Sequence, residues 1–181
     1  MFGKSLIDDV KPPSSRSQDG YPILFSNANI RQMLKLANVG KNDVFFDLGS
    51  GWGQNGLLAL TEFRVKKAVG IEGNMNRWRK SSNRLLRWKR HYAPFELNGR
   101  FILADYDDFF FDGQKTPEIK GESLKEATAI FYGLGTSRDL ARQLGKTLSM
   151  GCRLLYYYDC VFPEFLPMKR CFHSTIYEAN K

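Results

Sequence analysis

The stretch from Val44 to Gly56, VFFDLGSGWGQNG, constrains the fold of this chain more than any other part of the sequence. An apolar run ends in an acid, Asp47, and glycines then occupy the alternate positions Gly49, Gly51 and Gly53. An apolar segment typical of a helix follows. A strand, a glycine turn and a helix start are how α/β proteins bind nucleotide-like cofactors, because glycine lets the backbone approach a ligand where a Cβ would collide. The stretch therefore predicts an α/β fold with a cofactor at the turn.

The rest of the chain alternates between predicted strands and predicted helices. Apolar runs that predict strands lie at about 44–48, 67–72, 100–104, 127–132, 151–158 and 174–178, and helical patterns lie at about 27–37, 54–63, 74–92 and 138–148. The polar segment 113–126 has no periodicity and predicts a surface loop. Strands alternating with helices imply right-handed βαβ units and a mostly parallel sheet. We therefore expect a Rossmann-like three-layer sandwich, with six or seven strands and an antiparallel strand at the C-terminus.

Length and composition fit one domain. The chain has 181 residues and is 43% hydrophobic, which is enough for a buried core. Residues 1–20 read as a polar N-terminal arm and residues 21–181 as the domain. No apolar run reaches the ~20 residues of a membrane span and no secretory signal pattern is present, so we expect an intracellular, cytoplasmic protein. Three cysteines without a CxxC pair and two distant histidines give little support for a metal site.

Two classes of cofactor fit the glycine turn. Gly51 to Gly56 matches the G-x-G-x-x-G fingerprint of dinucleotide-binding proteins, which is a weak signal by itself. Asp47 would repel the pyrophosphate of a dinucleotide, whereas it would attract the ammonium of S-adenosylmethionine. Acids also end the next two predicted strands, at Glu72 and Asp105. Three acids at corresponding positions favour S-adenosylmethionine.

Each predicted contact follows from the chemistry of that cofactor. Asp47 binds the ammonium directly or through water, and Glu72, nineteen residues after Gly53, accepts hydrogen bonds from the ribose hydroxyls. Asp105 accepts from the adenine amine, and Tyr106 lies beside the ring. The predicted cofactor-binding residues are Asp47, Gly49, Ser50, Gly51, Gly53, Gln54, Glu72, Asp105 and Tyr106.

The segment Asp47 to Gln54, DLGSGWGQ, resembles motif I of class I S-adenosylmethionine-dependent methyltransferases. More narrowly, it resembles the non-SET (Dot-like) histone-lysine methyltransferases, whose motif reads D-L-G-S-G-x-G-Q. Val69 to Glu72 and Ala104 to Tyr106 resemble two further motifs of that family, and Arg31 to Val39 is similar to the leading helix of small archaeal protein-lysine methyltransferases. The resemblance covers about residues 21–160 and implies a methyltransferase domain that acts on a protein lysine.

The chain departs from this family on the substrate side. The family's asparagine after the fourth strand is missing, and Tyr132, Gly133 and Leu134 occupy that region. Phe25-Ser26-Asn27 stands where the small relatives have a Pro-Thr-Pro-like start to the first helix, and the tail after Tyr158 is short. These departures concern the methyl acceptor rather than the cofactor.

A lysine acceptor must lose a proton before it attacks, and a desolvated aromatic pocket lowers its pKa. The predicted walls of that pocket are Tyr132, Tyr21, Phe25 and Tyr158, although ordinary packing explains each of them as well. Asp159 either positions an ammonium or caps a turn. No Asn/Asp-Pro-Pro-Tyr/Phe motif and no Pro-Cys pair follow the fourth strand, which argues against methylation of nucleobase amines, of glutamine, or of carbon through a cysteine.

The helix at 77–90, RWRKSSNRLLRWKR, supports RNA as a competing acceptor. It carries seven basic residues, no acid and two tryptophans, and the net charge of the chain is +8, a pattern suited to phosphates. However, the helical spacing of Trp78, Ser82, Leu85 and Trp88 predicts that the aromatic side chains pack on the sheet and that Arg and Lys form a solvated back. An RNA methyltransferase and a non-catalytic binding module with this fold therefore remain alternatives to a protein-lysine methyltransferase.

Overall fold

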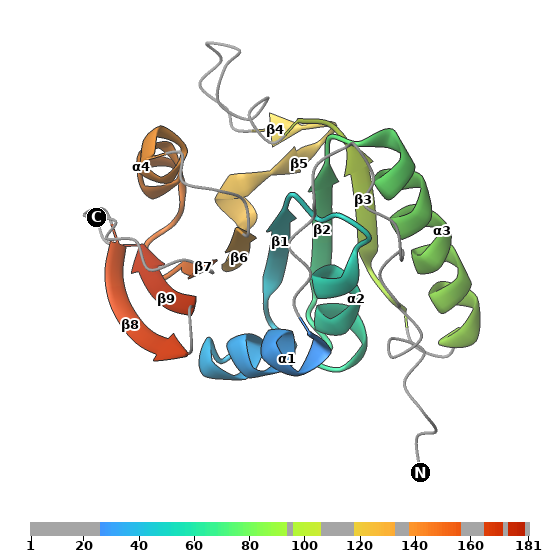
Figure 1. Ribbon diagram of the computed structural model, residues 1–181, viewed down its shortest axis with the longest axis horizontal. Coiled ribbons are helices and arrows are strands. Elements are labelled where there is room, and N and C mark those ends of the chain that lie inside the picture. Colours follow the sequence, from blue (N-terminus) through green and yellow to red (C-terminus); the bar gives the residue numbers. More distant parts are fainter. Residues whose placement is uncertain are drawn as a thin grey trace.

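The computed structural model describes residues 26–93, 96–105, 118–132, 138–156, 165–171 and 174–179. Its main sheet has seven strands in the order β3-β2-β1-β6-β7-β9-β8 (Figure 1). All neighbouring strands from β3 to β7 are parallel, and β9 is antiparallel to both β7 and β8, as predicted for the C-terminal strand. The strands are β1 (Val44–Leu48), β2 (Lys67–Glu72), β3 (Gly99–Leu103), β6 (Ala129–Tyr132), β7 (Arg153–Tyr156), β8 (Phe165–Cys171) and β9 (Ser174–Ala179).

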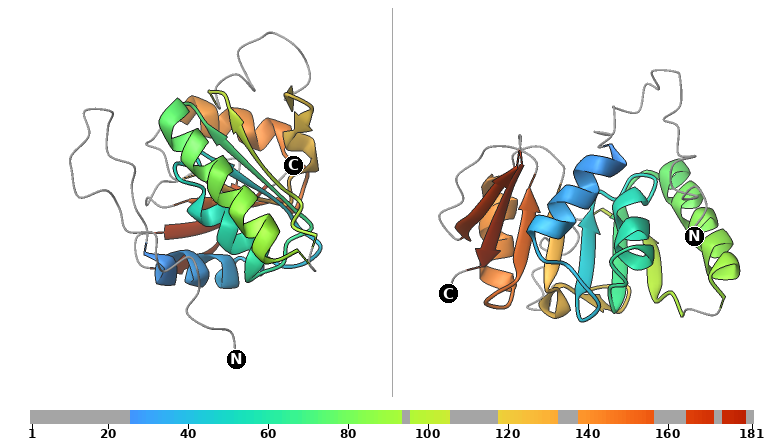
Figure 2. Two further views of the ribbon diagram at one scale, coloured as in Figure 1. Left: turned by 90° about the vertical axis from the view of Figure 1, so that its right-hand side faces the viewer. Right: turned by 90° about the horizontal axis from the view of Figure 1, so that it is seen from below.

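Helices cover both faces of the sheet, which confirms the three-layer sandwich. The helices α1 (Asn27–Leu36), α2 (Gln54–Thr61) and α3 (Met75–His91) lie on one face, and α4 (Arg138–Thr147) lies on the other (Figure 2). Successive residues of a strand point to opposite faces. Phe45 of β1 accordingly packs with the first three helices, whereas Phe46 packs in the separate core that contains Leu144 of α4.

The first helix begins where its sequence predicts. Ser26 is the N-cap, and its side-chain oxygen accepts a hydrogen bond from the backbone N–H of Asn29 at 3.1 Å. The apolar face of α1 then buries Ile30, Met33 and Leu34 against α2 and the sheet. The cap and the apolar stripe together fix the start and the orientation of α1.

Two described elements differ from the prediction. The expected surface loop at 113–126 is described from residue 118, and that part forms the hairpin β4 (Glu118–Ile119) and β5 (Glu122–Ser123) and a 3-10 helix (Leu124–Glu126). The loop prediction is wrong there, because Glu122 makes ion pairs with Lys67 at 2.5 Å and Arg100 at 3.4 Å, contacts that local periodicity cannot show. Strand β8 was also not predicted, since Pro167 interrupts its pattern; β8 lies at the sheet edge, where proline is tolerated.

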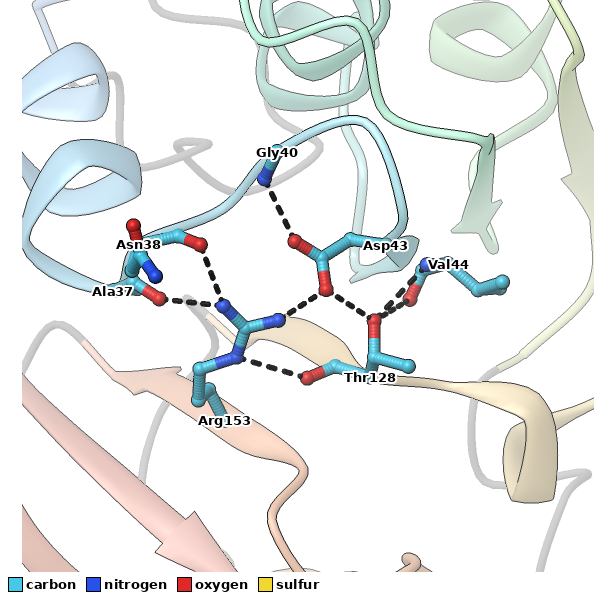
Figure 3. Close-up of polar contacts among 7 residues, drawn as sticks. All are labelled: Ala37, Asn38, Gly40, Asp43, Val44, Thr128 and Arg153. Atoms are coloured by element: carbon cyan, nitrogen blue, oxygen red, sulfur yellow. Dashed lines mark hydrogen bonds and ion pairs between the residues drawn. The ribbon is translucent and has the colours of Figure 1, made fainter.

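Arg153 joins the beginnings of three parallel strands to the end of α1 (Figure 3). Asp43, which precedes β1, forms an ion pair with the Arg153 guanidinium and also accepts a hydrogen bond from the Thr128 hydroxyl at 2.7 Å. The guanidinium donates further hydrogen bonds, at 2.7 to 3.2 Å, to the backbone carbonyl oxygens of Ala37, Asn38 and Thr128. This cluster closes the N-terminal edge of the sheet, opposite to the edge at which β1 enters the glycine turn.

The chain changes direction across the sheet at β1. The strands β1, β2 and β3 follow one another outward, and the chain then returns to place β6 on the other side of β1. In open α/β sheets, ligands bind beyond the C-terminal ends of the strands at such a switch point. A ligand site is therefore expected at the C-terminal ends of β1, β2 and β6.

Candidate cofactor site

Asp47 lies near the C-terminal end of β1, at the switch point, and is fully buried. Its Oδ1 accepts a hydrogen bond from the Asn55 side chain at 3.2 Å, whereas Oδ2 has no hydrogen-bond partner among the described residues. Burial raises the pKa of Asp47 from 3.8 to about 7; the Asn55 hydrogen bond opposes this rise and the nearby Glu72 charge adds to it. A buried acceptor without a partner is costly, so the position of Oδ2 is suited to a cationic ligand.

Two glycines of the turn after Asp47 differ in the space that surrounds them. Gly51 and Gly53 both have positive φ, +55° and +75°. A Cβ on Gly53 would lie 2.5 Å from the Phe101 ring and 2.9 Å from Cβ of Ser81, whereas a Cβ on Gly51 would meet nothing within 4 Å. Gly53 is therefore required by internal packing, and Gly51 faces space that the described residues leave open.

Glu72 at the end of β2 shapes the turn directly. One carboxylate oxygen accepts a hydrogen bond from the Gly51 N–H at 2.6 Å, and the other accepts from the Asn74 N–H at 2.8 Å. The Arg77 guanidinium lies 3.8 Å from the same carboxylate. Each carboxylate oxygen has a second lone pair, so Glu72 retains acceptor capacity for hydroxyl groups of a ligand.

Helix α3 also supports the glycine turn, which the sequence did not predict. Arg84 donates a hydrogen bond to the backbone carbonyl of Trp52, within the turn, at 2.8 Å. Arg77, Ser81 and Arg84 share one stripe of α3, and the prediction that all basic residues of this helix form a solvated back is wrong for these two arginines. Their spacing of four and three residues in the sequence indicates that they share one face of a helix, and it could have predicted this contact.

The tryptophans of α3 pack on the sheet as predicted. Trp88 is buried, and Trp78 donates a hydrogen bond from its indole N–H to the Phe101 carbonyl at 3.0 Å. The small residue that faces the sheet is Ser81 rather than the predicted Ser82, because Ser81 is the one beneath the glycine turn.

The glycine turn and the start of α2 together add three polar side chains to the site. Asn55, which the sequence did not single out, holds Asp47. Gln54 donates a hydrogen bond to the Asn27 side chain and so links the turn to α1. The hydroxyl of Ser50 is buried and has no hydrogen-bond partner within the described parts of the chain. Ser50 and Asp47 thus both leave polar atoms available at the same turn.

The third predicted acid lies beside the second. Asp105 follows β3 and is exposed, and the preceding residue, Ala104, donates its N–H to the backbone carbonyl of Glu72 at 3.2 Å. The end of β3 therefore adjoins Glu72 at the end of β2. Tyr106, predicted to lie beside the adenine ring, is outside the described residues.

The predicted acceptor pocket is described only at Tyr132. This residue ends β6, is 1% exposed, and stacks on Tyr156 with ring centroids 5.6 Å apart. Both tyrosines belong to the core beneath α4, whereas Asp47 points to the face covered by the first three helices. The other members of the predicted pocket, together with the neighbouring acid, lie outside the described residues: Tyr21, Phe25, Tyr158 and Asp159.

No metal site is found in the described ranges, and the thiol of Cys152 is buried. Those ranges contain no group of three or more His, Cys, Asp or Glu residues placed to bind a metal ion. Cys152 is buried, and burial raises the pKa of its thiol to about 12, so it is inert at neutral pH. Of the helices described, none is long and apolar enough to cross a membrane.

Strand order, the acid at the tip of β1 and the glycine turn held by a second acid define the class I methyltransferase fold. An RNA methyltransferase from Salinibacter ruber, solved with S-adenosyl-L-homocysteine, superposes with a TM-score of 0.64 at 24% identity, over 87% of this chain and 92% of that one. The putative methyltransferase yhhF from Escherichia coli gives a TM-score of 0.60 at 17% identity, over 84% of this chain and 85% of that one. At these identities the two structures show a shared fold.

The family follows from the sequence comparison. The family model "Histone methylation protein DOT1" matches residues 17–131, more than half of the chain, and the chain belongs to this family. A protein-lysine N-methyltransferase from Saccharolobus islandicus (strain REY15A) is 44% identical over 52 residues, which are 29% of this chain and 32% of the relative. The matched segment thus spans about a third of the length of that curated relative.

Proposed function

We propose that this chain is an S-adenosylmethionine-dependent methyltransferase that methylates a protein lysine. The assignment of the cofactor rests mainly on the buried Oδ2 of Asp47. This atom has no hydrogen-bond partner among the described residues and lies at the switch point of the sheet. A carboxylate at this place attracts the ammonium of S-adenosylmethionine and repels the pyrophosphate of a dinucleotide. The open side of Gly51 leaves room for the ligand at the same turn.

The residues of the turn have separate roles in this proposal. Asp47 holds the ammonium, and a cation in contact lowers the pKa of this carboxyl from about 7, so that it is ionised at neutral pH when the site is filled. Glu72 accepts from the ribose hydroxyls while it holds the turn through Gly51. Asp105 and Tyr106 contact the adenine. The cofactor supplies an electrophilic methyl group on a sulfonium.

Membership of the DOT1 family and the 52-residue match to a protein-lysine methyltransferase support lysine as the acceptor. The protein must hold an uncharged amine in line with the methyl group, and exclusion of water lowers the pKa of the acceptor ammonium. In our proposal Tyr21, Phe25 and Tyr158 form the walls that exclude water, whereas Tyr132, which is buried in the core beneath α4, supports the sheet and does not line the pocket. The likeness to an RNA methyltransferase concerns the fold and adds no support for an RNA acceptor.

Calorimetric titration with S-adenosylhomocysteine tests the cofactor. We expect Glu72→Gln to weaken binding at least tenfold, since a hydrogen bond to a charged group contributes about 1.5–3 kcal/mol. Glu126→Gln is the matched control, because Glu126 is 59% exposed and pairs with Lys67 at 3.5 Å, away from the turn. Absence of binding to the wild-type protein at millimolar ligand would refute the cofactor assignment.

Transfer of a radiolabelled methyl group into a cell lysate tests the acceptor. We expect the label to be lost after protease treatment, to resist RNase, and to appear as methyl-lysine after acid hydrolysis. Label that RNase removes and protease does not would reject lysine in favour of RNA. Label that appears on another amino acid would reject lysine while leaving methyl transfer to protein intact.

A further inference from the structure

The outer face of α3 carries a group of exposed cations that we call the α3 band. It consists of Arg79, Lys80, Arg87, Lys89 and Arg90. Among the described residues, none of the five has a hydrogen bond or an ion pair through its side chain, and α3 contains no acid. The band differs in this respect from Arg77 and Arg84 on the inner side of the helix, which contact Glu72 and the Trp52 carbonyl.

Bringing these charges together on one helix is unfavourable in the isolated domain. Like charges three or four residues apart destabilise a helix by about 0.2–0.5 kcal/mol per pair. The repulsion is visible inside the helix, where burial and then the charge of Arg87 lower the pKa of Arg84. No described acid offsets the band, so a polyanion outside the chain is the partner that its charge fits.

The exposed side chains argue against a protein as that polyanion. The large apolar residues exposed on α3 are Leu86 and Met75, at 55% and 54%. They lie eleven residues apart, or about three helical turns. A protein interface is usually organised around a contiguous apolar or aromatic centre, and two separated side chains do not form one.

The buried tryptophans argue for a duplex rather than a single strand. Proteins that bind single-stranded nucleic acid combine basic grooves with exposed aromatic rings on which bases stack. Trp88 is buried against the sheet, and Trp78 is half-buried with its indole N–H bonded to the Phe101 carbonyl, so both rings are held against the sheet. His91, at the C-terminal end of α3, is the one exposed aromatic side chain of this helix, and a single ring does not provide a stacking surface for successive bases. The band therefore fits a backbone in which the bases are already paired.

We propose that the α3 band binds the phosphate backbone of double-stranded DNA. Arg79 and Arg90 lie on the same side of the helix, about 16 Å apart along its axis. That distance is sufficient to contact phosphates on both edges of the B-form major groove, which is about 12 Å wide, whereas the narrow major groove of A-form RNA excludes a helix. The band begins near Asn74, beside the cofactor site, so bound DNA extends away from that site along α3. The proposal is independent of the methyl-transfer proposal.

Fluorescence anisotropy with a labelled 20-base-pair DNA tests this proposal. The variant Arg79→Gln/Arg87→Gln/Arg90→Gln removes three charges from the band. The control Lys35→Gln/Lys41→Gln/Lys66→Gln removes three charges from exposed lysines elsewhere, so both proteins change from +8 to +5. We expect the band variant to raise Kd at least tenfold and the control to raise it less than threefold.

The salt dependence of binding provides a second measurement. Each phosphate contact contributes about 0.9 to the slope of log K against log salt concentration, so the band variant should lose about 2.7 of that slope and the control much less. Thermal melting verifies that both variants are folded. Equal weakening in the two variants, tighter binding of the single strand or of polyglutamate than of the duplex, or no binding of the duplex at 50 mM salt would each overturn the proposal.

Discussion

Replacing Gly51 and Gly53 separately by alanine should distinguish the residue that limits cofactor affinity from the residue that limits stability. Both residues have positive φ, so alanine at either costs about 1–2 kcal/mol of backbone strain. At Gly53 the new methyl group would also lie 2.5 Å from the Phe101 ring, and such overpacking adds about 1–3 kcal/mol. At Gly51 the methyl group would meet no protein atom within 4 Å.

We therefore expect Gly53→Ala to be less stable than Gly51→Ala by about 1–3 kcal/mol. For a chain of this length, this difference corresponds to roughly 2–12 °C in the midpoint of thermal unfolding. Urea unfolding at constant pH gives the free energies directly, and the unfolding slope with denaturant should be the same in the two variants.

The order of the two effects should reverse in the binding assay. Gly51→Ala is expected to weaken S-adenosylhomocysteine at least tenfold in calorimetric titration at a temperature where the variant is fully folded, because its methyl group projects into the space assigned to the ligand. Two results would refute the reasoning. One is a Gly51→Ala protein that binds with the wild-type affinity. The other is an equal loss of stability in both variants, which would mean that the Phe101 ring moves away from the new methyl group without a loss of stability.

Two further predictions concern buried charge. Because the pKa of Asp47 is raised from 3.8 to about 7 in the folded protein, its contribution to stability is present at low pH and is lost as the pH rises, by about 2 kcal/mol between pH 5 and pH 7. Urea unfolding of Asp47→Asn should lack this decline, and parallel pH profiles would contradict the assignment. Arg153→Met should cost about 3–5 kcal/mol, since it leaves the Asp43 carboxylate without its ion pair. Its affinity for S-adenosylhomocysteine should remain wild-type at a temperature where it is folded, and weakened binding there would contradict the separation of the two edges of the sheet.

Much of the candidate cofactor site could be located from the sequence, because its strands and its glycine turn follow directly from local sequence patterns. An apolar strand that ends in an acid and enters a glycine turn identifies the tip of β1, and the same reasoning places Glu72 at the tip of β2. Parallel strands bring their C-terminal ends to one edge, so the proximity of these acids follows from the alternation of elements. The family relationship was likewise accessible, because motif I is contiguous.

Residues that act across the sheet or between helices were not predictable in this way. The loop predicted at 113–126 is partly a hairpin because Glu122 meets Lys67 and Arg100, which precede it by more than twenty residues. Strand β8 exists at the edge of the sheet because β9 pairs with it on one side, despite Pro167. In both cases the deciding contacts are distant in sequence, and local propensity opposes them.

The sequence by itself determined the class of fold, the position of the glycine turn and the acids at the strand ends, since each depends on a short run of neighbouring residues. The tertiary structure alone decided which glycine serves packing and which faces open space, because that depends on where Phe101 of β3 lies. It also divided the basic residues of α3 between the turn and the solvent, because only the packing of the helix on the sheet fixes which stripe is covered. Charge and spacing are properties of the sequence, but burial depends on what the rest of the chain places opposite each side chain.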